Sequence, residues 1–166
     1  LGDVYKRQAE EWIGGARNFA TKLWNATRFA MMNGATVAGD LPSFESLDGI
    51  NQWIISRLDE TITEVDALLE KFEFAKACEL IYHFAWDDLC DWYLELSKAS
   101  FAAGGASAAQ SARVLGHVLD QLLRLMHPVM PFITEELWCA LTGGESLMIS
   151  SWPTPKTVVG ENNSYA

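Results

Sequence analysis

The sequence has no long apolar run. No segment approaches the roughly 18–20 consecutive uncharged apolar residues of a membrane span, and nothing near the start resembles a secretory signal. Of its 166 residues, 49% are hydrophobic, which is enough apolar surface for a packed core. These observations argue against a membrane-bound or disordered chain. We expect one globular domain in the cytoplasm.

Cysteine is scarce, and the cysteines do not show the spacing of a metal-binding or redox motif. The three residues Cys78, Cys90 and Cys139 form no Cys-x-x-Cys pair, and each lies in an apolar helical pattern. An odd number of isolated cysteines is typical of free thiols in a reducing compartment. We therefore predict three buried free thiols rather than disulfides or metal ligands.

Catalytic and cofactor motifs are also missing. The sequence contains no phosphate-binding glycine loop and no nucleophile motif. A di-iron bundle would need Glu-x-x-His pairs, but Glu79 and His83 are four residues apart. Carboxylates at helical spacing could hold a divalent cation, but we interpret them as a solvated acidic face; they are Asp87, Asp88, Asp91 and Glu95. We predict no catalytic residue, no metal and no cofactor in this chain.

Charge is segregated along the chain, whose formal net charge is −10. Residues 12–39 contain no carboxylate and carry three cations, whereas residues 58–95 contain eleven carboxylates and two lysines. An acidic protein repels nucleic acid as a whole. A cationic segment in such a chain indicates that one face contacts an anion while the rest of the surface does not.

Strand alternation is absent, apart from a short piece around residues 147–152 that we expect to be extended. Helical periodicity instead predicts about five helices and hence an all-α bundle. The helices are expected from Ala9 or Gly14 to Met32, from Asp48 as N-cap through Leu69, from Phe74 to Ser100, from the Ala- and Ser-rich segment after the Gly104-Gly105 break to the stop at Pro128, and from Pro131 to Leu141. Residues 9–153 form this domain.

The two ends are expected to lie outside it. Residues 1–8 match no structural period and resemble a translated sequencing adaptor, so we exclude them from the fold. Residues 154–166 are polar and rich in small residues, which is typical of a frayed C-terminal segment or linker.

The same periodicity predicts the core. On the second and fourth helices the expected core residues are Trp53 or Ile54, Leu58, Ile62, Val65, Leu69, Val114, Leu115, Val118, Leu122, Leu125 and Met126. Aromatic residues with aliphatic neighbours are also assigned to the core; they are Trp86, Trp92, Tyr93 and Trp138. His127 is expected to cap the fourth helix, where a donor meets free carbonyls.

The first helix has two chemically different sides. One arc of roughly 140° carries Arg17, Arg28, Thr21, Asn25, Asn18, Lys22 and Phe29, and the apolar side carries Ala26, Phe19, Ala30, Leu23, Ala20 and Trp24. Amides offer the donor and acceptor that base edges require, and cations hold phosphates or stack on bases. The arc is a candidate surface for unpaired RNA bases. The alternative is an ordinary solvated face, with Phe29 packed under the loop at residues 34–42.

Four motifs strengthen the RNA interpretation because together they resemble the anticodon-binding domain of valyl-tRNA synthetases. They occur in the family's order at residues 16–29 (ARNFATKLWNATRF), 53–58 (WIISRL), 84–95 (FAWDDLCDWYLE) and 127–138 (HPVMPFITEELW). The last motif is similar in the isoleucyl and leucyl relatives, whereas residues 22–29 and Ser151-Trp152-Pro153 resemble the valyl enzymes. The family's two activation motifs are absent from the sequence.

The resemblance implies a helical anticodon-binding domain of a class Ia aminoacyl-tRNA synthetase. The parent ligase would join valine to its tRNA using ATP and Mg²⁺, and this fragment would recognise tRNA without catalysing the reaction. Its partners would be the anticodon loop of valine tRNA and the catalytic core of the same polypeptide, with neither DNA nor a membrane involved. Valine anticodons share adenine and cytosine at their second and third positions.

We assign anticodon binding to the arc of the first helix, namely to Arg17, Asn18, Lys22, Asn25, Arg28 and Phe29, with Trp24 as possible stacking support. Two alternatives stay open. The chain could be the equivalent domain of an isoleucyl or leucyl relative, or a stand-alone helical module whose acidic helices bind a basic protein.

Overall fold

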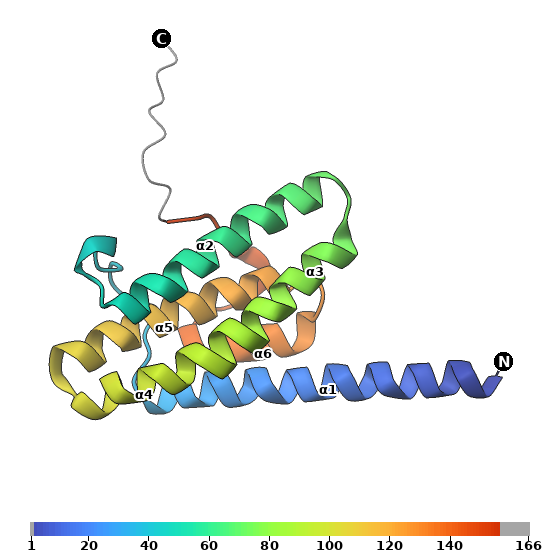
Figure 1. The fold of residues 1–166 in the computed structure, drawn as a ribbon, viewed down its shortest axis with the longest axis horizontal. Helices are drawn as coiled ribbons and strands as arrows, with labels where there is room; N and C mark the ends of the chain where they lie inside the picture. Colours follow the sequence, from blue (N-terminus) through green and yellow to red (C-terminus); the bar gives the residue numbers. More distant parts are fainter. Residues whose placement is uncertain (1, 157–166) are drawn as a thin grey trace, which may run out of the picture.

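The computed structural model describes residues 2–156, apart from the side chains of residues 2–5, 8, 9 and 11–13. This part of the chain contains no strand. Its elements are α1 (Gly2–Met32), α2 (Gly49–Glu70), α3 (Phe74–His83), the π-helix η2 (Phe84–Tyr93), α4 (Leu94–Ala103), α5 (Gly105–Met126), α6 (Pro131–Thr142), and the 3-10 turns η1 (Phe44–Ser46) and η3 (Leu147–Ile149). Because α3, η2 and α4 follow one another without a break, residues 2–156 form five helical rods (Figure 1). The predicted all-α bundle is confirmed.

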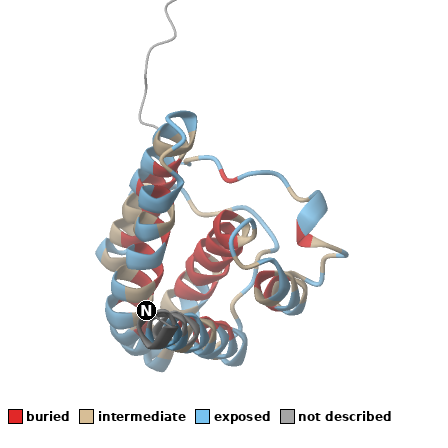
Figure 2. Cartoon of the chain, turned by 90° about the vertical axis from the view of Figure 1, so that its right-hand side faces the viewer, coloured by how far each residue is buried: buried red, intermediate tan, exposed pale blue. Residues whose placement is uncertain are grey.

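Helix α5 lies in the middle of the bundle (Figure 2). From Ser111 to Met126 it is buried at every position except Arg113 and Arg124, and it contacts α2, α4, α6, α1 and α3. Its buried Asp120 carboxylate is paired, as burial requires: it accepts from Trp138 Nε1 at 2.7 Å and from Arg124 Nε at 2.9 Å. The bond from Trp138 joins α6 to α5, and the bond from Arg124 lies within α5.

Most helix ends follow the predicted signals. Gly34 and Gly143 adopt positive φ after α1 and α6, and Pro131 occupies the first turn of α6. Two boundaries differ from expectation. Helix α1 begins at Gly2, so residues 2–8 continue it. The piece at Leu147–Ile149, expected to be extended, is a 3-10 turn.

Part of the C-terminal segment that was predicted to be frayed is bound to the bundle. At its described end, the Lys156 N–H donates to the Asp59 carboxylate at 3.1 Å. The rest of the segment predicted to be frayed, residues 157–166, lies outside the described residues, as does Leu1.

The predicted aliphatic core is largely confirmed. Ile54, Leu58, Ile62 and Val65 are fully buried, as are the α5 residues assigned to the core, and Trp53 and Leu69 pack against it. Of the aromatic residues, Tyr93 and Trp138 are buried and Trp86 packs against the core. The assignment of Trp92 to the core was wrong, because this residue is 61% exposed.

The π-helix explains this error. In a π-helix each N–H bonds the carbonyl five residues earlier, so residues five apart share a face. The Leu94 N–H bonds the Leu89 carbonyl in this way, and Phe84, Leu89 and Leu94 are all buried. In an α-helix, Trp92 would share the buried face of Leu89, which lies three residues earlier. In the π-helix it does not, and its side chain lies outside the core.

Two smaller predictions need correction. The three cysteines are free, as expected, but each is only partly buried. His127 follows α5 as predicted, but its Nδ1 contacts Thr134 Oγ1 at 2.9 Å rather than a free helix carbonyl. Thr134 lies in the first turn of α6. Its hydroxyl is therefore the hydrogen-bond partner of the His127 ring, in place of the carbonyls at the end of α5. No helix within residues 2–156 is long and apolar enough to cross a membrane.

The loop after α1 crosses α5 at Gly116. The Thr36 N–H bonds the Ala112 carbonyl at 3.3 Å, and the Arg113 guanidinium donates to the Gly39 carbonyl at 2.8 Å. A Cβ atom on Gly116 would overlap the Thr36 backbone. Only glycine therefore allows the loop to lie this close to α5.

We predict that Gly116→Ala lowers the free energy of unfolding by about 1–3 kcal/mol, because the loop must move to admit the methyl group. Urea denaturation of the 166-residue chain measures this. Gly49→Ala is the matched control, since a Cβ there meets no atom within 4 Å. Equal behaviour of the two variants would show that the loop does not rest on Gly116.

Candidate functional site

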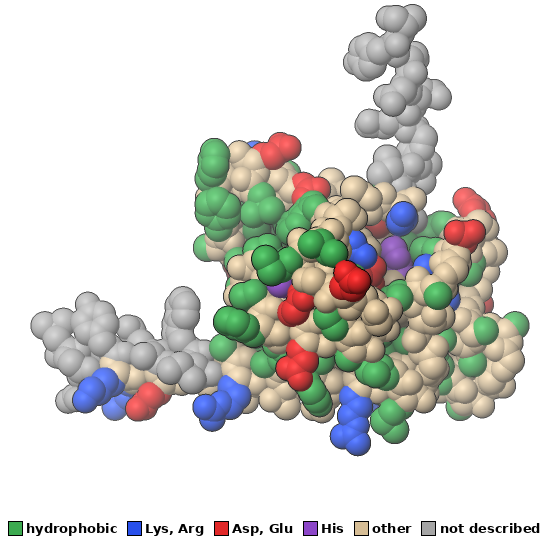
Figure 3. All heavy atoms as spheres, turned by 180° about the vertical axis from the view of Figure 1, so that it is seen from behind, with side chains coloured by type: hydrophobic (Ala, Val, Ile, Leu, Met, Phe, Trp, Pro, Cys, Tyr) green, Lys and Arg blue, Asp and Glu red, His purple; other side chains and the backbone are tan. Residues whose placement is uncertain are grey.

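One side of α1 carries polar side chains that the bundle does not use. Arg17, Asn18, Thr21, Asn25 and Arg28 are exposed, and we call these five residues the α1 strip. Within the described part of the chain, only Thr21 has a side-chain hydrogen bond, to the Arg17 carbonyl at 3.0 Å. Lys and Arg side chains project from the edge of the molecule where α1 runs (Figure 3). The strip is therefore open to an external ligand.

The buried side of α1 holds the strip in place. Phe19, Leu23, Ala26 and Ala30 are each at most 6% exposed, and α1 contacts α6, η2 and α5. Burying this apolar stripe stabilises one rotation of the helix about its axis, which turns the polar stripe outward. The orientation predicted for Asn18, Asn25 and Arg28 agrees with the structure.

Lys22, which was predicted to belong to the binding surface, already has a partner on η2. Its Nζ lies 2.6 Å from Asp91 Oδ1 and 3.8 Å from the centre of the Trp86 ring. Partial burial raises the pKa of the neighbouring Cys90 thiol to about 11. Lys22 thus neutralises a carboxylate of η2 and joins that segment to α1.

The two aromatic candidates lie on opposite edges of the strip. Phe29 is half-buried and packs edge-on against Phe101 of α4, at 5.9 Å between ring centroids. Trp24 was expected on the apolar side of α1, but it is 46% exposed. Of the two, Trp24 is the ring available to a ligand.

Beside Trp24, a groove of about 620 Å³ separates α1 from α6. Trp24, Thr27, Arg28 and Met31 line it from α1, and Leu137 and Ala140 from α6. Reasoning from the sequence missed this groove, because its two walls are more than a hundred residues apart in the chain. The sequence showed the helical period of α6, but it did not show which face of α6 lies against α1.

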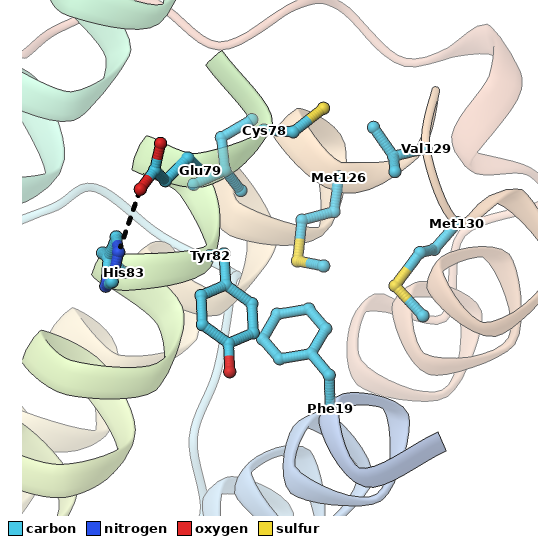
Figure 4. A pocket seen from close by; sticks show the side chains of 9 residues that line it. Phe19, Cys78, Glu79, Tyr82, His83, Met126, Val129 and Met130 are labelled. Carbon is cyan, nitrogen blue, oxygen red and sulfur yellow. Dashed lines mark ion pairs between the residues drawn. The ribbon is translucent and has the colours of Figure 1, made fainter. Parts of the chain in front are cut away.

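A second hollow, of about 440 Å³, lies between α1, α3 and the turn after α5. Phe19, Tyr82, Met126 and Met130 surround it, and the Glu79–His83 ion pair, 3.7 Å long, lies at its edge (Figure 4). Almost all of its wall is apolar. This arrangement suits packing and supplies no set of groups for bond-making.

The acidic residues of η2 have partners within the protein itself. Asp88 pairs with Arg57 at 3.1 Å and Asp91 pairs with Lys22, while Asp87 lies 3.1 Å from His83. Each carboxylate thus has a different partner on a different element or turn. Over the described residues, no group of three metal-binding side chains is placed to hold an ion.

An exposed strip of amides and arginines on a helical bundle fits the family that comparison of the sequence finds. Residues 51–165 match the family described as the anticodon-binding domain of tRNA ligase. The chain belongs to this family. The predicted resemblance is confirmed, although the matched range begins in α2 and leaves out α1.

The anticodon-binding domain is also similar to parts of bacterial valine–tRNA ligases. It is 58% identical over 144 residues to the protein of Streptomyces avermitilis, which covers 87% of this chain and 16% of that protein. It is 59% identical over 143 residues to the protein of Nocardia farcinica, covering 86% and 16%, and 51% identical over 150 residues to that of Mycobacterium tuberculosis, covering 90% and 16%. The chain thus spans about one sixth of the length of these relatives.

The contacts of Lys22 predict a structural role that the strip residues lack. Lys22→Met should lower the free energy of unfolding by about 1 kcal/mol, through loss of the Asp91 ion pair and the cation–π contact. Arg17→Met should change it by less than about 0.5 kcal/mol, because the Arg17 side chain has no partner among the described residues. Urea denaturation of both variants tests this, and a larger effect at Arg17 would contradict the assignment.

Proposed function

We propose that this chain is the anticodon-binding domain of a valine–tRNA ligase and that the α1 strip binds the anticodon loop of valine tRNA. The observation that carries the proposal is the strip itself. In a chain of net charge −10, the exposed side chains of Arg17, Asn18, Asn25 and Arg28 are cations and amides. That combination suits a polyanion whose bases are unpaired.

The residue types divide the work of recognition. The amide groups of Asn18 and Asn25 each present a donor and an acceptor to the edge of a base. The guanidinium groups of Arg17 and Arg28 neutralise phosphates or stack on bases. Lys22 and Phe29, which bond and pack inside the bundle, support the helix that carries these groups rather than contacting RNA directly.

In the parent ligase, this domain would contribute binding energy far from the chemistry. The names of the relatives indicate joining of valine to tRNA, a reaction that uses ATP and Mg²⁺ in the catalytic core of the same polypeptide. Holding the anticodon loop orients the acceptor end of the tRNA toward that core. Binding energy spent at a distance in this way lowers the barrier of the transfer step.

The first test is binding by the chain itself. In a gel shift, the 166-residue chain should bind valine tRNA more tightly than the same tRNA with a changed anticodon. Raising the salt concentration should weaken both complexes, because cation–phosphate contacts release counterions. Equal affinity for the two tRNAs would contradict the proposal and favour a module that binds another protein through its acidic helices.

The second test uses the full-length ligase that contains this chain. Arg28→Ala or Asn25→Ala should reduce kcat/KM for tRNA charging by a factor corresponding to about 1–3 kcal/mol. Activation of valine by ATP, measured by pyrophosphate exchange, should be unchanged, because the chemistry takes place elsewhere.

Lys71→Ala provides the matched control, since Lys71 is an exposed cation on the α2–α3 turn, away from α1. It should leave tRNA charging unchanged. A loss of both charging and activation in the Arg28 variant would point to misfolding, and an equal loss of charging in the Lys71 variant would point to general electrostatics.

A further inference from the structure

The turn between α2 and α3 has an unusual backbone conformation. Phe72 has a φ of 59°, and it is the only residue other than glycine with positive φ in the part of the chain that the structure describes. Its N–H bonds the Leu69 carbonyl at 3.0 Å, and the Glu73 N–H bonds the Leu68 carbonyl at 2.9 Å. These two bonds define a Schellman motif. The left-handed residue of this motif is usually glycine, because a Cβ atom is strained there.

The end of α1 shows the same motif without the strain. There the Ala35 N–H bonds the Ala30 carbonyl at 2.9 Å, and the left-handed residue is Gly34, with a φ of 74°. Phe72 therefore occupies a position that this chain fills with glycine elsewhere. Its ring is 79% exposed and contacts the ring of Phe74, which is also exposed, at 6.2 Å between centroids. A strained residue whose side chain is not used by its own fold is typical of a functional surface.

Exposed apolar side chains continue from Phe72 across this end of the bundle. Phe74, Val129 and Trp152 are exposed, and together with Cys78 they line a hollow of about 380 Å³. The hollow of Figure 4 adjoins it, since Cys78 and Val129 line both. We call these five residues the apolar end. Hydrophobic side chains gather at this end of the molecule in Figure 3, and a continuous apolar surface of this kind is typical of a protein interface.

The charges of the turn indicate what kind of surface fits the apolar end. Residues 70–76 contain two carboxylates and two lysines, and Glu73 pairs with Lys76 at 2.9 Å. The turn therefore offers no net charge to a basic or an acidic partner. A second copy of the chain is also disfavoured, because each copy carries a net charge of −10. An apolar surface that is held close by covalent connection fits best.

We propose that the apolar end is covered by an apolar segment of the same ligase polypeptide, outside these 166 residues. The chain spans about one sixth of the length of its relatives, so a ligase of their size contains enough further chain to cover this surface. In Figure 1, the first half of α1 extends past the bundle at the end where α2 meets α3. Covalent connection raises the effective concentration of such a segment. The inference rests on the proposed function, because that function places the chain in a ligase.

The reactivity of Cys78 tests whether the apolar end is covered. Iodoacetamide alkylation is followed peptide by peptide in the 166-residue chain and in the full-length ligase that contains it. We expect Cys78 to react at least tenfold more slowly in the ligase, while Cys139 on α6, which lines neither hollow, changes less than twofold. Equal rates for Cys78 in the two proteins, or slowing of both thiols by the same factor, would overturn the proposal.

Phe72→Gly should have opposite effects in the two proteins. In the 166-residue chain it relieves the backbone strain, so the midpoint of urea unfolding should rise. In the full-length ligase it removes the exposed ring from the interface, so alkylation of Cys78 should become about fivefold faster. Leu96→Ala is the matched control, because Leu96 is an exposed apolar residue on α4, at the other end of the bundle. It should leave the rate of Cys78 unchanged in both proteins. A lower midpoint for Phe72→Gly, or unchanged protection of Cys78 in the ligase variant, would contradict the proposal.

Two further measurements separate the alternatives. If sedimentation shows that the 166-residue chain dimerises, and Cys78 becomes protected as the dimer forms, the apolar end binds a second copy and the proposal is overturned. The gel shift with valine tRNA tests the α1 strip alone. If that shift fails while Cys78 is protected in the ligase, the proposed RNA binding is wrong and the covered surface is supported. If the shift succeeds and Cys78 is unprotected in the ligase, only the inference about the apolar end is wrong.

Discussion

The structure depends on the burial of α5 from all sides. A helix can be surrounded in this way only if its polar groups find partners and its neighbours approach closely enough to exclude water. Asp120 meets the first condition by accepting from Trp138 and Arg124. Gly116 meets the second by letting the Thr36 backbone lie against the helix. The other rods take their places by packing against α5, and α1 is one of them.

The position of α1 in the bundle decides which of its side chains are exposed. Its apolar stripe contacts α5, α6 and η2, so its polar stripe must face outward. Two acidic residues of η2 are meanwhile paired with cations of α1 and α2, and a third lies beside His83 of α3. Charge segregation along the sequence thus becomes segregation in space, with an open cationic and amide-rich strip on one helix and carboxylates with partners inside the protein on its neighbour. On the proposed function, such a surface binds RNA at one place and not over the whole molecule.

The candidate site was predicted in part from the sequence. The outward orientation of Asn18, Asn25 and Arg28 follows from helical periodicity, which depends on neighbours three and four residues away. Lys22 falls in the same arc, but Asp91, 69 residues later, takes its charge. Trp24 was assigned to the buried side of α1, but it is 46% exposed and lines the groove between α1 and α6. The sequence of one helix does not reveal where a neighbouring helix stops covering it.

By itself, the sequence determined the all-α class, the five rods, most of their ends and the aliphatic core, because these depend on local propensities, caps and a regular period. It also indicated the family through four motifs in order. Only the tertiary structure decided that Trp92 faces solvent, that Lys22 binds Asp91, and that Thr27 lines a groove against α6. The first depends on a change of helical register in η2, and the other two on contacts between segments far apart in the chain, whose relative positions are set by packing around α5.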